Sequence, residues 1–341
     1  MGKRITLKQI ANEFGVSIAT VSKSLNDSYE ISSATKEKIQ NYAKANNYQS
    51  KSIPLNLNTK KTKTIGVIIP NIMNNFFAKA FVGIEKMATE KGYHLISCIS
   101  NESHEKEVTT MELLKNGTLD GVIISLAEET QVKKNYNHIK NAINEGIPVV
   151  MFDRVADDIS CDKVVVNDVE GAYHATNHLI KSGCKRVALI SVIDNLSVGK
   201  LRVEGYKKAL TVHNINIEEK LIVKIGHKED FDIALKIILA DKSIDGLLCL
   251  EETSAVKSLQ IVKQMNYSIP TEMSIVSFTN GELPKYVTPT ITTVSQHGNH
   301  IGQTAANILI DRLTGESENK PFVKKVIKTS LIERESTRKL N

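Results

Sequence analysis

Two groups of side chains in this chain of 341 residues have the types and spacing that specific binding requires. The first group lies near the N-terminus, where a short helix is predicted from Ile18 to about Leu25. Its outward face combines small polar side chains, apolar ones and one lysine, namely Ser17, Ile18, Ala19, Ser22 and Lys23. Apolar groups can contact a thymine methyl and a lysine can reach the acceptors of guanine, so this face suits the major groove of DNA.

The second group follows the carboxyl ends of predicted parallel strands, which is where open α/β sheets bind their ligands. It combines carboxylates, guanidinium groups, amides and aromatic rings, and it comprises Phe76, Phe77, Asp153, Arg154, Asn167, Arg202, Glu251, Thr279 and Asn280. A carboxylate beside an arginine can accept and donate hydrogen bonds around the hydroxyl groups of a sugar. The pair Phe76-Phe77 can pack on a ring face, although one of the two rings is expected in the core beneath the following helix.

Local signals predict the helices that position the first group. Thr6 and Gln9 form a capping box that starts a helix at Leu7. Gly15 stands where that helix can end in a left-handed residue. Ser17 can cap the next helix, and two short helices joined by a tight turn make a helix-turn-helix.

A third helix, capped by Ser33 and ending near Asn46, is predicted to complete a three-helix headpiece. An ordinary helical hairpin would give the same capping signals, but the charge favours a nucleic-acid partner. Residues 1–64 contain ten Lys and one Arg against four acids, a balance of +7, whereas the whole chain carries +6. The positive charge is therefore concentrated in this small N-terminal module, as in a protein that binds the phosphate backbone.

From residue 65 onward, short Val/Ile/Leu-rich strands alternate with amphipathic helices in two successive series. This alternation predicts an α/β core of two doubly wound subdomains, with parallel sheets covered on both faces. The expected parts are a headpiece at 1–47, a linker at 48–64, and a core at 65–341, whose first subdomain spans about 65–163 and 293–321 and whose second spans about 164–292 and 322–341.

The run T-x-x-x-I-A-x-x-x-G-V-S-x-x-T-V-S-x-x-L-N resembles the DNA-binding headpiece of the LacI-type (lactose-repressor) family of bacterial transcription regulators. The matching residues are Thr6, Ile10, Ala11, Gly15, Val16, Ser17, Thr20, Val21, Ser22, Leu25 and Asn26. The resemblance runs to the end of the chain and implies a periplasmic-binding-protein-like core. It also implies a hinge helix whose Leu57 wedges into the minor groove. Pro54 replaces a usual Ala there, so either a hinge helix begins near this proline and is short, or the hinge works differently.

The resemblance assigns roles to individual headpiece residues. Base-reading positions of the family fall on Ile18, Ala19 and Lys23, with Lys23 in place of a usual Arg, which gives up bidentate geometry. The neighbouring polar side chains are expected to contact phosphates and set the register, namely Thr6, Ser17, Thr20, Ser22 and Asn26.

Three core motifs resemble segments with which the family contacts its effectors: N-x-F-F at 74–77, F-D-R at 152–154 and R-x-x-G-Y at 202–206. Two positions depart from the family pattern. Glu251-Glu252 stand where many members have Asn-Asp, and Thr279 replaces an acid. The resemblance therefore implies a small-molecule effector between the subdomains more firmly than it implies a sugar or a sugar derivative, which is the class we expect.

Signals for catalysis, cofactors and metals are absent or poor. The chain has no G-x-G-x-x-G after its first core strand and no G-x-x-x-x-G-K-[ST]. His174 and His178 share a helix face with Glu170, but without H-E-x-x-H a solvated face is the expected interpretation. We expect no enzyme, no cofactor and no metal. The rival enzymatic hypothesis needs an acid pair of Asp153 with a carboxylate at 251 or 252.

Composition bounds the cellular setting. Hydrophobic residues make up 41% and charged residues 24% of the chain, as in a globular protein, and no apolar run approaches a membrane span. The N-terminus lacks the apolar stretch of a secretory signal, and the four cysteines show no C-x-x-C spacing. These features favour a cytoplasmic protein over an exported solute-binding protein, which would need a signal and no basic headpiece.

The expected function is sequence-specific regulation of transcription by a homodimer that binds pseudopalindromic double-stranded operator DNA. We expect a repressor, although activation stays open because the position of the operator decides it. Whether the effector releases the protein from DNA or tightens its binding also stays open. The expected dimer face includes the helix at 76–91 and the segment 98–120. The chain has no C-terminal leucine heptads, which favours a dimer over a tetramer.

Overall fold

The computed structural model describes residues 5–25, 27–46, 48, 62–116, 119–226, 229–279, 281–317 and 320–339. It divides into two units, Met1–Thr62 and Lys63–Asn341. The sequence-based expectations for Asn26, Pro54, Leu57 and Asn280 lie outside the described residues.

The first unit contains helices α1 (Leu7–Phe14), α2 (Ile18–Leu25) and α3 (Ser33–Ala45). The predicted capping box is present, because Thr6 and Gln9 each accept a hydrogen bond from the other's backbone N–H, at 3.3 and 2.8 Å. Gly15 adopts a left-handed conformation with φ 60°, which permits the tight turn into α2. The cap of α3 is Ser32 rather than the expected Ser33, since the Ser32 hydroxyl accepts the N–H of Thr35.

The core of this headpiece is small. Side chains from all three helices meet in it, namely Ile10, Ala11, Val21, Ile39 and Ala43. The rings of Phe14 and Tyr42 pack edge to face at its margin, with centroids 5.2 Å apart. The expected helix-turn-helix is thus held by apolar contacts that α3 completes.

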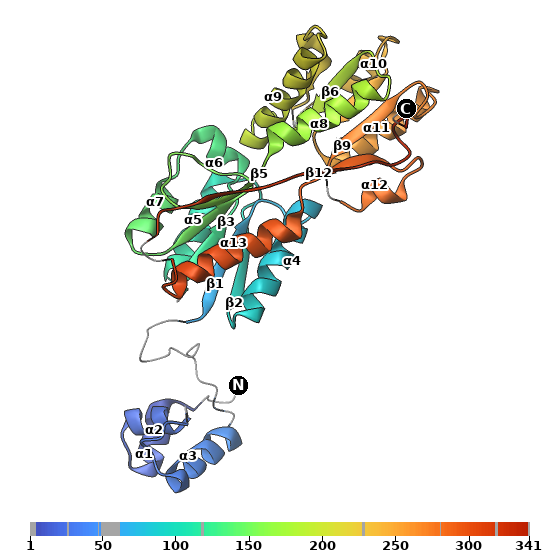
Figure 1. Cartoon of the computed structure of the whole chain (residues 1–341). Helices are drawn as coiled ribbons and strands as arrows, with labels where there is room; N and C mark the ends of the chain where they lie inside the picture. The colour runs from blue at the N-terminus through green and yellow to red at the C-terminus, as the bar shows by residue number, and fades with distance from the viewer. Residues whose placement is uncertain are drawn as a thin grey trace. The chain divides into compact units, whose positions relative to one another are not determined.

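The second unit contains two parallel α/β subdomains (Figure 1). The first sheet has the order β11-β5-β4-β3-β1-β2 among the described residues, and every pairing in it is parallel. Its strands are β1 (Thr64–Ile69), β2 (His94–Ile99), β3 (Gly121–Ile124), β4 (Val149–Phe152), β5 (Asp162–Val166) and β11 (Lys324–Ile327). Its helices are α4 (Asn75–Glu90), α5 (His104–Asn116), α6 (Glu128–Lys133), α7 (Asn137–Asn144) and α13 (Gly298–Leu313).

The second sheet has the order β12-β10-β9-β8-β6-β7 in the described chain, with an antiparallel pairing at β12. Its strands are β6 (Val187–Ser191), β7 (Ile222–Lys224), β8 (Gly246–Cys249), β9 (Ser274–Phe278), β10 (Thr292–Ser295) and β12 (Ser330–Ile332). The helices around it are α8 (Asp168–Lys181), α9 (Ser197–Val212), the 3-10 turn η1 (Glu219–Leu221), α10 (Phe231–Leu239), α11 (Glu252–Gln264) and α12 (Leu283–Tyr286).

The chain crosses between subdomains later than the expected positions near 163, 293 and 322. We expected β5 to open the second series, but it pairs with β4, and β11 pairs with β5. Val164, Val166 and Ile327 therefore belong to the first core. The crossings lie between β5 and α8, between β10 and α13, and between β11 and β12. A Val-rich strand carries no local mark of the sheet it joins, which explains the displacement.

Helices α4 and α13 approach each other closely (Figure 1). A Cβ at Gly83 would clash with the carbonyl oxygen of Asn299, and a Cβ at Gly302 would clash with that of Ala80. Glycine at both positions therefore lets the two backbones come into direct contact, which a larger side chain would prevent.

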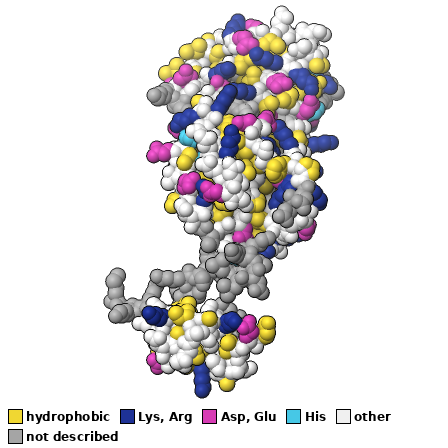
Figure 2. Space-filling model, turned by 90° about the vertical axis from the view of Figure 1, so that its left-hand side faces the viewer, with side chains coloured by type: hydrophobic (Ala, Val, Ile, Leu, Met, Phe, Trp, Pro, Cys, Tyr) yellow, Lys and Arg dark blue, Asp and Glu magenta, His cyan; other side chains and the backbone are white. Residues whose placement is uncertain are grey.

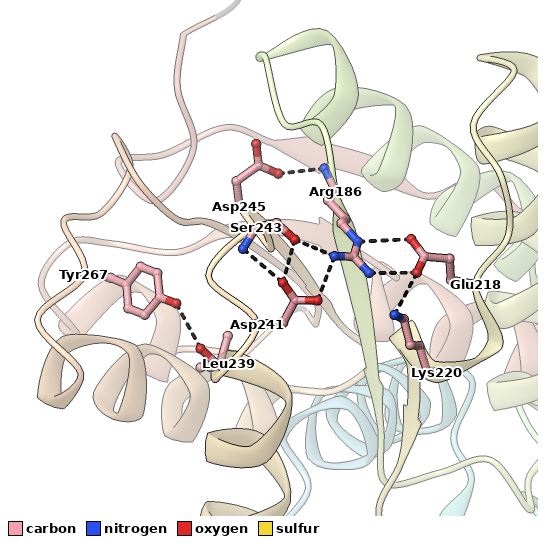
Figure 3. Close-up of polar contacts among 8 residues, drawn as sticks. All are labelled: Arg186, Glu218, Lys220, Leu239, Asp241, Ser243, Asp245 and Tyr267. Carbon is pink, nitrogen blue, oxygen red and sulfur yellow. Dashed lines mark hydrogen bonds and ion pairs between the residues drawn. The ribbon is translucent and has the colours of Figure 1, made fainter.

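An ion cluster centred on Arg186 lies where β6 begins in the second subdomain (Figure 3). The Arg186 Nε and Nη2 atoms donate to the two carboxylate oxygens of Glu218 at 3.0 and 2.7 Å, and Nη1 donates to Asp241 at 2.7 Å. Lys220 adds a second cation 3.3 Å from Glu218. In this Arg186 cluster every carboxylate thus contacts a cation or a backbone or hydroxyl donor.

Candidate functional site

The exposed face of α2 carries the residues that the sequence singled out for DNA. Ser17, Ile18 and Ala19 are exposed, and Ile18 leaves 49% of its surface accessible. The Ser17 hydroxyl accepts the N–H of Thr20 at 3.0 Å, so Ser17 caps α2 as expected. An exposed isoleucine in the first turn of a helix gains nothing from the protein core, and it is available for apolar contact with a partner.

Lys23, the expected base-reading cation, forms an ion pair with Glu30, which follows α2 in the chain. Both side chains are about half exposed, and such a pair stabilises little. Thr20 and Ser22 are partly exposed on the same helix, and Thr6 is exposed at the start of α1. The described DNA candidates are thus all accessible, at least in part.

In the second unit, a cleft of about 580 Å³ lies between the two subdomains, at the carboxyl ends of strands from both sheets. It brings together seven of the nine effector-site candidates, namely Phe76, Phe77, Asp153, Arg154, Arg202, Glu251 and Thr279. The volume is in the range of small-molecule sites.

Arg202 sits on α9 and is buried at the cleft wall. Its Nε donates to Asp168 at 2.8 Å and its Nη1 to the carbonyl of Leu250 at 2.7 Å. The guanidinium stacks on Phe278, 3.8 Å from the ring centroid. Burial raises the pKa of Asp168, while Arg202 acts in the opposite direction. Removing Arg202 would therefore leave a buried carboxylate without its cation.

Arg154 lines the opposite wall and pairs with a residue that the sequence reasoning missed. Its Nη1 donates to Glu102 at 2.6 Å, and its guanidinium lies 5.2 Å from the Phe77 ring centroid. Glu102 also accepts the N–H of Glu128 at 2.9 Å, and both acids line the cleft. They follow β2 and β3, so the strand-end rule that found Asp153 could have found them.

Asp153 is the most unusual side chain of the cleft. It has a left-handed backbone with φ 57°, which is strained for a residue other than glycine. It is 6% exposed, and its Oδ1 has no hydrogen-bond partner among the described residues. Burial and the Asp168 carboxylate raise its pKa to about 6, against the effect of Arg154 and Arg202. Its charge is therefore poorly compensated by the protein.

The neighbouring acids of α11 differ from each other. Glu251 is the N-cap of this helix, and its carboxylate accepts the N–H groups of Thr253 and Ser254. Glu252 accepts the hydroxyl of Thr279 at 3.2 Å and the N–H of Leu283 at 3.0 Å. Burial raises the pKa of Glu252. The Thr279 hydroxyl therefore donates to an acid at the start of α11.

Asn167 and the Phe76-Phe77 pair differ from the expectation. Asn167 does not line the cleft, because its side-chain oxygen accepts the N–H of Thr329 at 2.8 Å and so joins two of the crossings. Phe77 is buried against Phe152, with centroids 6.2 Å apart, and Phe76 packs edge-on against Phe77. Both rings thus serve the core of the first subdomain as well as the cleft wall.

The two subdomains touch at both rims of the cleft. At one rim, Gln131 of α6 and Ser197 of α9 exchange two hydrogen bonds of 3.0 and 3.1 Å. Asn195 donates to Glu128 at 3.2 Å beside them. At the other rim, Lys79 of α4 forms an ion pair with Glu282 at 3.0 Å. These are polar contacts that a change in cleft opening would break or make.

The histidine pair on α8 is not a solvated face as expected. His174 is exposed, but His178 is buried and its Nε2 lies 3.0 Å from the hydroxyl of Thr337, because the C-terminal segment packs over this face. No group of three or more His, Cys, Asp or Glu that could hold a metal occurs among the described residues. No helix in the described part of the chain has the length and apolar character to cross a bilayer.

Comparison with known proteins supports both units. A family model described as bacterial regulatory proteins, lacI family, matches residues 6–51, and one described as a periplasmic binding protein-like domain matches residues 176–337. The HTH-type transcriptional regulator RegA of Clostridium saccharobutylicum is 32% identical over 339 residues, covering 97% of this chain and 99% of the relative.

Solved structures agree in fold. A LacI family transcriptional regulator from Enterococcus faecium with bound ribose is 26% identical with a TM-score of 0.70, covering 82% of this chain and 100% of that one. The lac repressor dimer bound to operator has a TM-score of 0.80 at 20% identity, covering 98% and 99%. These findings confirm the expected headpiece and two-subdomain core. The chain belongs to the lacI family of bacterial regulatory proteins and is a transcriptional regulator.

Proposed function

We propose that this regulator is a cytoplasmic repressor whose affinity for operator DNA is set by a small molecule held in the cleft between its core subdomains. The observation that carries the proposal is the cleft itself, whose walls come from both subdomains and whose rims are joined by polar contacts. A ligand in such a cleft touches both walls, so it favours one degree of opening over another.

The mechanism is thermodynamic linkage. An effector that binds one opening state better than another changes DNA affinity only by that difference, and operator DNA changes effector affinity by the same factor. The Gln131–Ser197 and Lys79–Glu282 contacts contribute to the balance between states, because they exist only when the rims are close. The cleft has a binding role in this proposal and no catalytic one.

On the headpiece, we propose that Ile18, Ala19 and Lys23 read bases. Lys23 would exchange Glu30 for the acceptors of a guanine, an exchange that costs little because the ion pair is half exposed. The phosphate contacts are assigned to Thr6, Ser17, Thr20, Ser22 and Asn26, and minor-groove wedging to Leu57.

We further propose a homodimer through the first subdomain, which implies a pseudopalindromic operator. Three large apolar side chains are exposed there: Val82 of α4 at 57%, Ile96 of β2 at 43% and Leu113 of α5 at 70%. Strand β2 is also the edge of its sheet. An apolar face at a sheet edge is what a stable self-association would cover.

The test is selection of random duplex DNA on the purified full chain at about physiological salt, followed by sequencing. A recovered pseudopalindrome supports a symmetric dimer with two reading heads, and a central pyrimidine–purine step supports wedging by Leu57. Metabolites are then screened for release or tightening of the same DNA. A protein that selects no motif, with or without cell extract, would contradict the proposal.

A further inference from the structure

The lining of the cleft has an unusual balance of charge. Among the described lining residues, five carry carboxylates and two carry guanidinium groups: Glu102, Glu128, Asp153, Glu251 and Glu252 against Arg154 and Arg202. The formal charge of this lining is therefore −3. On the face that Figure 2 shows, Lys, Arg, Asp and Glu side chains are interspersed.

Each arginine of the lining already has a carboxylate partner in the protein. Arg154 is bound to Glu102 at 2.6 Å, and Arg202 is bound to Asp168 at 2.8 Å. A phosphate or carboxylate group on a ligand would therefore share a cation whose charge is already balanced, and it would lie among the remaining acids. Like charges in a partly dehydrated site repel strongly, so the cleft disfavours anionic ligands.

One carboxylate oxygen in the cleft wall lacks any partner from the described protein. Asp153 lines the cleft and is only 6% exposed. Its Oδ1 accepts no hydrogen bond from the described residues. Buried carboxylate oxygens are ordinarily paired with a donor. Two cations and two acids surround Asp153: Arg154, Arg202, Asp168 and Glu102. Arg154 binds Glu102 and Arg202 binds Asp168, so no cation in this group is left to balance the charge of Asp153.

Glu252 supplies a second acid on the facing subdomain. Its carboxylate is held by Thr279 and by the N–H of Leu283, which are neutral donors. No Lys or Arg is bonded to it among the described contacts, although Lys79 lies near enough to act on it. The two walls of the cleft thus each present a carboxylate whose charge is only partly balanced.

We propose that the effector of this cleft carries a positive charge, as a sugar-sized polyol with a protonated amine, and that Asp153 and Glu252 select it. This inference rests on the proposed function, because it names the chemical class of the same effector. The ammonium group would bind between or beside the two carboxylates through charge-assisted hydrogen bonds. Its hydroxyl groups would meet the remaining polar lining, including the buried Gln296.

The experiment uses the full chain and a panel of amino sugars. Each amino sugar is paired with its neutral parent, its N-acetyl derivative and its 6-phosphate, so that charge varies on one skeleton. Binding is measured by calorimetry at pH 7. We expect at least one amine to bind about tenfold or more tightly than its neutral parent and its N-acetyl derivative, with no binding of the phosphate. A neutral parent that binds as tightly as its amine, or a panel in which no amine binds, would overturn the inference.

Isosteric variants separate charge from shape. Asp153→Asn and Glu252→Gln should each remove most of the preference for the amine over its neutral parent. Glu219→Gln, at an exposed acid outside the cleft, is the matched control and should keep the preference. The readout is a ratio of two affinities for the same variant, so a partial loss of folded protein does not alter it. An unchanged ratio in both cleft variants would contradict selection by these carboxylates.

The DNA readout distinguishes this inference from the proposed function. If the amine binds but leaves operator affinity unchanged, the cationic class stands and the repressor mechanism fails. If a neutral sugar alone binds and shifts operator affinity, the mechanism stands and the cationic class fails.

Discussion

The second unit holds two arginine–carboxylate groups of similar composition and opposite electrostatic character. In the Arg186 cluster, hydrogen bonds from Arg186 lower the pKa of Glu218, and those from Ser243, with Arg186, lower the pKa of Asp241. In the cleft, burial raises the pKa of Asp153 to about 6 and also raises that of Glu252. The first group favours ionised acids and the second disfavours them.

The difference teaches how to tell a structural ion cluster from a binding site. Arg186 engages both of its acids directly, so its cluster is complete within the fold (Figure 3). The cleft contains acids that the protein buries without enough cations. Such an arrangement lowers stability, and we infer that a ligand completes it. Variants within and around each group test this contrast.

The largest effect is expected for Arg202→Ala. This change leaves Asp168 buried without its cation, so the free energy of unfolding should fall by about 3–5 kcal/mol. Urea unfolding at pH 7 measures it. The double variant Arg202→Ala with Asp168→Asn should lose less than the single variant, because the unpaired charge is gone. If the free energy of unfolding of Arg202→Ala falls by less than about 1 kcal/mol, the Arg202–Asp168 pair stabilises the fold no more than an exposed ion pair does.

Asp153→Asn should have the opposite sign. The folded pKa of Asp153 lies above its ordinary value of 3.8, so the protonated form is favoured by folding and its stabilisation is lost as the pH rises from about 4 to about 6. At pH 7 the neutral amide should therefore raise the free energy of unfolding by about 1–3 kcal/mol, and the gain should shrink as the pH falls through this window.

Urea unfolding at pH 7 and at pH 4.5 checks this sign. Asp157→Asn, at an exposed acid, is the control and should change little at either pH. Destabilisation by Asp153→Asn at pH 7 would mean that its carboxylate already has a favourable partner, and the contrast between the two groups would then be lost.

Sequence reasoning reached the parts of the molecule that depend on near neighbours in the chain. The Thr6–Gln9 box, the turn at Gly15 and the Ser17 cap are local, and the structure reproduces them. The alternating strands and helices likewise follow from periodicity. Residues at strand ends fall in the cleft because parallel strands share an edge, which is how Asp153 and Arg154 were found.

The remaining differences come from contacts between distant segments. Asn167 is taken up by Thr329, and His178 is covered by the C-terminal segment at Thr337. Neither partner is visible from the sequence around the residue. The assignment of β5 to the first sheet has the same cause, since its side chains pack with those of a strand near the C-terminus. The sequence also could not show which acids of the cleft have a cationic partner, because the pairing of Arg154 with Glu102 joins residues far apart in the chain.

A smaller effect is expected at the rim, where Gln131→Ala removes the contacts with Ser197. The loss of stability should be about 0.5–1.5 kcal/mol, as for ordinary hydrogen bonds. The loss of these contacts favours the open cleft, so the affinity should fall for an effector that binds the closed cleft and rise for one that binds the open cleft. The preference for a charged ligand should not change. Calorimetry with the best-binding amine and its neutral parent measures both, and Gln264→Ala, at an exposed position of α11, is the control. An altered charge preference would mean that the rim and the carboxylates act together.

The smallest effect is expected in the Arg186 cluster. Glu218→Gln should lower the melting temperature slightly, because both partners are partly exposed to solvent. The pKa of Glu218 lies below its ordinary value of 4.5, so its contribution is present above that pH and is lost as the pH falls through the lowered value. Thermal unfolding across pH 3–7 checks the direction. Effector binding should be unchanged, and any effect on it would weaken the distinction between the two groups.

The close contact of α4 with α13 has a mechanical consequence. Helix α4 spans about 24 Å, with Phe76 in the cleft at one end and Tyr93 just past the other. The Tyr93 ring lies 4.2 Å from the ammonium group of Lys63, where the chain enters the core. Gly83 and Gly302 allow direct backbone contact between α4 and α13, so we expect the two helices to move together as a rigid pair. A shift of α4 at its cleft end would then also move its other end, next to Lys63.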